Sequence, residues 1–100
     1  MAELVDLPAG RQARTTLNIF LMEYTVYALQ SIKHNYIYVG QTSDFDDRFS
    51  RHNNGRERTT RFYRPFKMII TEKYSTRIDA RQREKYLKSG CGKEWLKSLL

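Results

Sequence analysis

The sequence predicts an α/β fold of the α+β kind, in which helices flank a three-stranded antiparallel sheet in the order β-β-α-β-α-α. Three short segments rich in tyrosine, valine and isoleucine indicate the strands. The segments between and after them open on serine or threonine and run towards glycine, as helices do. A chain of 100 residues, 40% of them hydrophobic and 29% charged, has room for one small core.

The strands are expected at residues 23–30, 35–41 and 66–74. The first two form a hairpin across a polar connector, and alternation places Tyr36 and Tyr38 on one face of the second strand. The third segment, FKMIITEKY, is the most apolar of the three. We therefore expect it to be the central strand, because a strand that is buried on both faces is apolar throughout.

The first helix is expected at residues 43–55. Ser43 is a suitable N-cap, acidic residues follow in the first turn, and Gly55 ends the segment. Phe45 and Phe49 are four residues apart, so they give this helix an apolar face.

Two more helices are expected after the third strand. Residues 75–90 predict a helix with Thr76 as its N-cap and Gly90 at its C-terminal stop. A short final helix follows within residues 92–100, and its apolar side chains are expected to pack back on the sheet. These side chains are Trp95, Leu96, Leu99 and Leu100.

Ordered sequence is expected to begin at Met22, so that residues 22–100 form a single domain. Residues 1–21 contain a proline and a glycine and show little periodicity. We interpret them either as a flexible N-terminal extension or as the product of a start codon assigned too early. Cys91 is the only cysteine, which excludes an internal disulfide and favours a reducing compartment.

Lysine and arginine outnumber aspartate and glutamate by 18 to 11, giving a net charge of +7. Such a surplus indicates a polyanion partner, nucleic acid ahead of an anionic membrane, although a generic basic surface is the alternative. The candidate contacts lie in a basic loop, where Phe62 and Tyr63 interleave the cations, and on one face of the second helix. They are Arg56, Arg58, Arg61, Arg64, Arg81, Lys85 and Lys88.

Five further residues are candidates for chemistry. Arg48 and His52 project from one side of the first helix, because they are four residues apart. Glu84 falls within the apolar stripe of the second helix, where a carboxylate is unusual unless it is paired, hydrogen-bonded or bound to a metal. Tyr27 and Tyr38 form a pair across the hairpin. Their structural alternatives are a solvated polar face, an ion pair at the rim of the core, and tyrosine packing in a sheet.

Several short motifs follow one another in a recognisable order. "TVY" at residues 25–27 precedes "YVG" at 38–40, and "DFDDRFSRHNNG", "RPF" and "ARQREKYLKSG" come later. Together they resemble the GIY-YIG nuclease superfamily over residues 23–98. The chain is most similar to the small stand-alone members that are related to the N-terminal nuclease domain of the excinuclease.

The resemblance implies an endonuclease that hydrolyses DNA phosphodiester bonds with Mg²⁺ or Mn²⁺. In the family one glutamate on a helix after the third strand holds the metal, and Glu84 matches it, as carboxylate oxygen suits a hard cation. Tyr27 and Tyr38 match the two motif tyrosines. The first of these helps to deprotonate the attacking water, and the second helps to orient it.

The resemblance also assigns roles to three further residues. Arg48 matches an arginine whose fork binds the scissile phosphate. His52 matches a histidine that can take a proton from the tyrosine, and Gly40 matches the motif glycine, whose missing side chain lets substrate approach the backbone. The setting that the resemblance suggests is DNA repair or the processing of branched DNA in a bacterial cytoplasm, with DNA favoured over RNA.

Two other classes of function stay open at this point. One is a non-catalytic nucleic-acid-binding module with the same fold, and the other is a domain that depends on a partner subunit for its specificity. Residues 25–26 read Thr-Val in place of Gly-Ile, and residues 86–97 lack an asparagine that several nuclease members carry there. Lys88 or Lys93 could contact phosphate instead. Retention of the five candidate residues together favours the enzyme.

Overall fold

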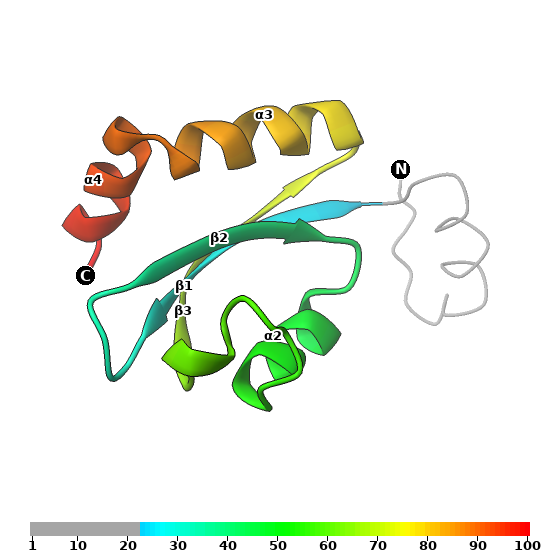
Figure 1. Cartoon of the computed structure of the whole chain (residues 1–100). Helices are drawn as coiled ribbons and strands as arrows, with labels where there is room; N and C mark the ends of the chain where they lie inside the picture. The colour runs from blue at the N-terminus through cyan, green and yellow to red at the C-terminus, as the bar shows by residue number, and fades with distance from the viewer. Residues whose placement is uncertain (1–22) are drawn as a thin grey trace.

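A computed structural model describes residues 23–100, so the expectations for residues 1–21 and for Met22 lie outside the described part of the chain. Within that part, the expected α+β fold and its element order are confirmed (Figure 1). In chain order the elements are β1 (Tyr24–Ser31), β2 (Ile37–Thr42), α2 (Phe45–Asn53), the short 3₁₀ helix η2 (Arg61–Tyr63), β3 (Phe66–Tyr74), α3 (Arg77–Lys88) and α4 (Gly90–Ser98).

The central strand of the sheet is β1, because the strand order is β2-β1-β3 and both pairings are antiparallel. The expectation that residues 66–74 form the central strand is therefore wrong. In β1 the run Val26–Leu29 is 0% exposed at every residue, whereas most side chains of β3 are exposed or half-buried. The continuous apolar run in β1 was the better indicator of a strand covered on both faces.

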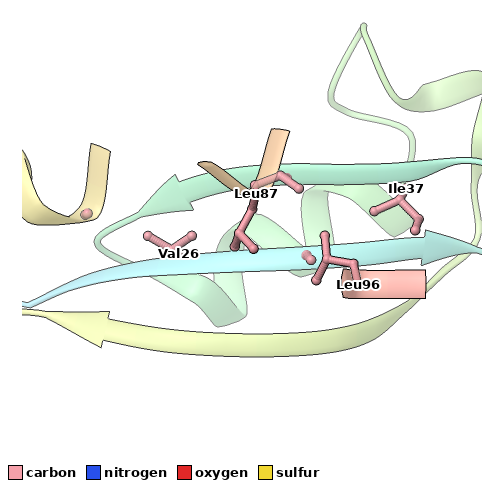
Figure 2. Close-up of a cluster of buried hydrophobic side chains, with 7 residues drawn as sticks. Val26, Ile37, Leu87 and Leu96 are labelled. Atoms are coloured by element: carbon pink, nitrogen blue, oxygen red, sulfur yellow. The ribbon is translucent and has the colours of Figure 1, made fainter. Parts of the chain in front are cut away.

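One face of the sheet, which we call the aliphatic face, is covered by α3 and α4 (Figure 1). Figure 2 shows Val26 and Ile37 of the sheet beside Leu87 of α3 and Leu96 of α4. Of the final helix's apolar residues, Leu96 alone is buried, as expected. The expectation was wrong for Trp95, Leu99 and Leu100, which are 38%, 46% and 56% exposed, because one helix of nine residues turns only one side to the core.

The opposite face, which we call the aromatic face, is covered by α2 and the chain that follows it. Tyr36 and Tyr38 lie here while Ile37 and Val39 lie on the aliphatic face, so the expected alternation is confirmed. The rings of Phe45 and Phe49 stack with centroids 5.5 Å apart and pack against this cluster.

The boundaries of α2 differ by one residue from the expectation at its start. The N-cap is Asp44, not Ser43, and its side chain accepts a hydrogen bond from the backbone N–H of Asp47. At the other end Gly55 adopts φ +76°, and the N–H groups of Gly55 and Arg56 bond back to the carbonyls of His52 and Arg51. This is the Schellman arrangement that glycine favours.

The helices on the aliphatic face begin at capping side chains. Thr76 caps α3 as expected, but α3 ends at Lys88 and Gly90 is already the first residue of α4. Ser89 therefore serves both helices, as the C-cap of α3 and the N-cap of α4. No helix of residues 23–100 is long and apolar enough to cross a membrane.

Candidate active site

A chain of three buried polar side chains lies between the sheet and α2. The Tyr27 hydroxyl is 2.9 Å from His52 Nε2, and His52 Nδ1 is 2.8 Å from Thr60 Oγ1. The three residues are 0%, 1% and 0% exposed. Because the Thr60 hydroxyl also lies 3.5 Å from the Glu57 carbonyl, we assign Nδ1–H as the donor to Thr60. The lone pair of Nε2 then accepts the Tyr27 proton.

Burial keeps both partners of this hydrogen bond neutral. Desolvation raises the pKa of Tyr27, as does the neighbouring Tyr38, while the positive charge of Arg48 opposes them. Desolvation also lowers the pKa of His52 below its ordinary value of 6.5. A neutral imidazole therefore faces a protonated phenol at neutral pH, so His52 can accept a proton from Tyr27.

Gly40 leaves room for the Tyr27 ring. The two residues are paired across β1 and β2, and a Cβ placed on Gly40 would lie 2.7 Å from the Tyr27 hydroxyl oxygen. The sequence-based expectation was that the missing side chain admits substrate. The structure shows Tyr27 itself in that space, so the glycine first of all allows this tyrosine to cross β2.

Arg48, on the half-buried side of α2, is close enough to Tyr27 to lower the pKa of its hydroxyl. Its Nε is 3.8 Å from a Glu57 carboxylate oxygen, which Arg51 Nε approaches to 2.7 Å. Glu57 is thus mainly the partner of Arg51, and the Arg48 fork is left largely free. Tyr38 completes the group, with its ring centroid 6.1 Å from that of Tyr27 and 4.9 Å from that of His52.

Glu84 lies on the other side of the sheet, on α3, next to the same edge strand. Its carboxylate accepts a 3.1 Å hydrogen bond from Gln41 Nε2, and Gln41 follows Gly40 directly along β2. The other carboxylate oxygen is 3.0 Å from Lys88 Nζ. The structure therefore brings together Tyr27, Tyr38, Arg48 and His52, and places Glu84 across β2 from them.

The surroundings of Glu84 fit a divalent cation that also binds water and phosphate. A hollow of about 390 Å³ is lined by Glu84, Gln41 and three cationic side chains of α3. Gln41 Oε1 is buried without a hydrogen-bond partner among residues 23–100, so a second hard oxygen is available beside the carboxylate. The described residues contain no group of three or more histidine, cysteine or acidic side chains that could enclose a metal. Mg²⁺ is commonly held by one or two carboxylates with substrate phosphate.

The candidate nucleic-acid contacts form two separate groups. Arg81, Lys85 and Lys88 surround the hollow that contains Glu84. The loop group, consisting of Arg56, Arg58, Arg61 and Arg64, is exposed and follows α2. Lys93 is committed elsewhere, because its ammonium group donates to the Ile37 carbonyl at 3.1 Å.

Sequence reasoning missed Thr60, Glu57 and Gln41. Thr60 and Glu57 come from the irregular segment after α2, where no periodicity marks a buried side chain. Gln41 could have been found, because strand alternation places it on the same face as Val39 and so towards the helix that carries Glu84.

Comparison with known proteins identifies the family. The sequence profile of the GIY-YIG catalytic domain matches residues 23–95. The UPF0213 protein YazA of Bacillus subtilis (strain 168) is 39% identical over 57 residues, which are 56% of this chain and 58% of that protein, so the match spans less than two thirds of YazA. The solution NMR structure of a UPF0213 protein from Bacillus halodurans is 32% identical, with 78% of this chain and 85% of that chain covered and a TM-score of 0.49.

Proposed function

The chain belongs to the GIY-YIG catalytic domain family, a nuclease-type family that acts on nucleic acid, and on that premise we propose that it is a divalent-metal-dependent endonuclease that hydrolyses DNA. The observation that carries the proposal is the buried hydrogen bond from Tyr27 to a neutral His52. A purely structural tyrosine needs no proton acceptor of this kind at its hydroxyl.

In the proposed reaction a water oxygen attacks phosphorus, and the bond from phosphorus to the 3′-oxygen breaks. The water proton passes to the Tyr27 oxygen while the Tyr27 proton moves to His52 Nε2, which leaves an imidazolium ion. Arg48 binds a phosphate oxygen and offsets the negative charge that develops there. The products are a 5′-phosphate and a 3′-hydroxyl, which takes its proton from solvent.

Tyr27 is 0% exposed, so this reaction requires the side chains over its hydroxyl to move when nucleic acid binds. Tyr38 is half-buried beside it and is the tyrosine positioned to orient the water. Glu84 and Gln41 are the residues that would hold Mg²⁺ or Mn²⁺, with phosphate and water completing the site. The metal would supply charge stabilisation at the leaving oxygen.

A cleavage assay on labelled single-stranded, duplex, flap and four-way DNA tests the proposal. With Mg²⁺ or Mn²⁺ we expect cuts that EDTA abolishes and that Tyr27→Phe and Glu84→Gln reduce by a factor of about 100 or more. Glu94→Gln is the matched control, because it removes a carboxylate that is 77% exposed on α4. Cleavage that persists unchanged in Glu84→Gln would contradict the proposed metal site.

A non-catalytic nucleic-acid-binding module is the second candidate function. It is favoured by the complete burial of Tyr27 and by the ion pair of Lys88 with Glu84, which neutralises the proposed metal ligand. The same assay separates the two functions, because this module binds DNA with equal affinity in the wild type and in Glu84→Gln and cuts none of the substrates.

We expect the enzyme to act in the cytoplasm on damaged or branched DNA, with DNA preferred to RNA. A partner subunit is a further part of the proposal, because a small domain with a shallow basic surface has little means of its own to select a sequence. Size-exclusion chromatography of cell extract, followed by cleavage assays of each fraction, measures whether the activity elutes with a larger complex.

A further inference from the structure

An exposed pair of aromatic rings lies where the β1–β2 turn meets η2. The rings of His34 and Phe62 stack with centroids 4.9 Å apart and an interplanar angle of 27°. Phe62 is 72% exposed, the largest exposed fraction among the large hydrophobic side chains of residues 23–100. Leaving a flat apolar ring in water forgoes its burial, so this position has no evident role in stability.

The two segments that carry these rings are fixed to each other. The Ile32 N–H donates to the Pro65 carbonyl at 2.9 Å, and the Ser31 hydroxyl donates to the Tyr63 carbonyl at 2.6 Å. Below Phe62, the rings of Tyr36 and Tyr63 stack at 3.7 Å with an interplanar angle of 8°. The exposed rings therefore stand on a rigid base, and binding them costs little conformational entropy.

Positive charge surrounds the exposed rings. They line a hollow of about 440 Å³ together with Lys33, Arg61 and Arg64, and no acidic residue lines it. Backbone carbonyls orient the two guanidinium groups, since Arg61 donates to Gly55 and Arg64 donates to Arg61. None of the three cations forms an ion pair with another residue of the described range 23–100.

We propose that His34 and Phe62 form a stacking platform for an unpaired base, with Lys33, Arg61 and Arg64 binding the phosphates beside it. A flat ring among cations suits single-stranded nucleic acid, because every base offers a π-face and every nucleotide offers a charge. Bases in a blunt duplex are already stacked and cannot use the platform. The surface thus selects substrates that have a single-stranded segment.

The platform adjoins the candidate active site. Tyr36, in its base, and Tyr38, in the site, are two residues apart on one face of β2, which corresponds to about 7 Å along a strand. A single strand on the platform therefore continues towards Tyr38. As a statement about substrate choice the inference rests on the proposed nuclease function, whereas the binding site itself does not.

Binding of labelled DNA in EDTA, measured by fluorescence anisotropy, tests the platform without cleavage. We expect Phe62→Ala to weaken binding of single-stranded and flap DNA by about tenfold and to leave blunt duplex binding unchanged. Ile78→Ala is the matched control, because Ile78 is 70% exposed on α3, away from the platform. Phe62→Trp should retain the affinity, and its indole fluorescence should be quenched as single-stranded DNA saturates the protein.

Other outcomes overturn the inference. Equal losses on duplex and single-stranded DNA in Phe62→Ala would show a general contact instead of base stacking. Unchanged binding in that variant, or competition by inorganic polyphosphate that is as strong against the wild type as against Phe62→Ala, would remove the base from the interaction. Platform binding in a wild-type protein that never cuts would refute the nuclease alone, and cutting without a Phe62 effect would refute the platform alone.

Discussion

The two faces of the sheet are built from alternate residues of the same strands, yet they differ in chemistry. The aliphatic face buries small and branched side chains against two helices. The aromatic face buries Tyr27, His52 and Thr60, whose polar atoms must all find partners. The comparison teaches that one face can supply most of the stability while the other keeps groups that exchange a proton. Mutations on the two faces should therefore separate folding from chemistry.

The largest expected effect on folding comes from the aliphatic face. Leu87→Ala should lower the free energy of unfolding by about 3 kcal/mol, because Leu87 is 0% exposed and contacts the sheet and α4. Urea unfolding measures the loss. Leu99→Ala, at a residue 46% exposed, is the control and should change the stability by less than about 0.5 kcal/mol. A similar loss in both variants would contradict the assignment of the core to this face.

Gly40→Ala tests how closely the aromatic face is packed. A Cβ there would overlap the Tyr27 hydroxyl, so we expect a loss of roughly 2 kcal/mol and displacement of Tyr27 from His52. Urea unfolding and the His52 NMR resonances report the two effects. Gly90→Ala is the matched control, since a Cβ at Gly90 meets no atom within 4 Å. An undisturbed His52 signal in Gly40→Ala would show that the ring has other room.

Thr60→Val separates the hydrogen-bonded chain from simple packing. The substitution leaves His52 Nδ1 buried without its partner, so we expect about 1.5 kcal/mol of destabilisation and a changed tautomer equilibrium. Imidazole ¹⁵N chemical shifts measure the tautomer. The neighbouring Thr59→Val, at an exposed residue, should change neither quantity. If the two variants behave alike, Thr60 does not orient His52.

The smallest expected effect is the dependence of stability on acid. The pKa of His52 is lowered on folding, so the unfolded chain takes up a proton first as the pH falls. Its contribution to stability is fully present above pH 6.5 and is lost as the pH falls from 6.5 to the pKa of the folded protein. Urea unfolding across this range measures the loss, which His52→Gln should remove. The Leu87→Ala variant should keep the wild-type acid dependence.

Local patterns predicted most of the fold. Alternation at residues 36–39 placed each side chain on its correct face, and Thr76 marked the start of α3. The strand order was not predictable from apolar content alone. Ile69 and Ile70 both lean towards the aliphatic face, because a register shift opposite Ala28 and Leu29 interrupts the alternation of β3. A bulge of this kind leaves no clear mark in the sequence.

The candidate site was predicted where a regular element carries the residue. Arg48 and His52 share a helix, so their spacing indicated that they lie together. His52 nevertheless bonds to Thr60, eight residues away through an irregular turn, which no periodic pattern describes. The position of Glu84 across β2 from the tyrosines depends on which face each helix covers, and this is decided by the packing of the whole domain.

The central place of β1 bears on how this site can move. Tyr27 belongs to the strand that is paired on both sides, and its neighbours from Val26 to Leu29 are fully buried. Amide hydrogens there should exchange with solvent only when the whole domain unfolds, more slowly than those of residues 54–65. Any opening that uncovers the Tyr27 hydroxyl must therefore come from the segment carrying Thr60 and from side chains, while the strand beneath stays fixed as the reference frame of the reaction.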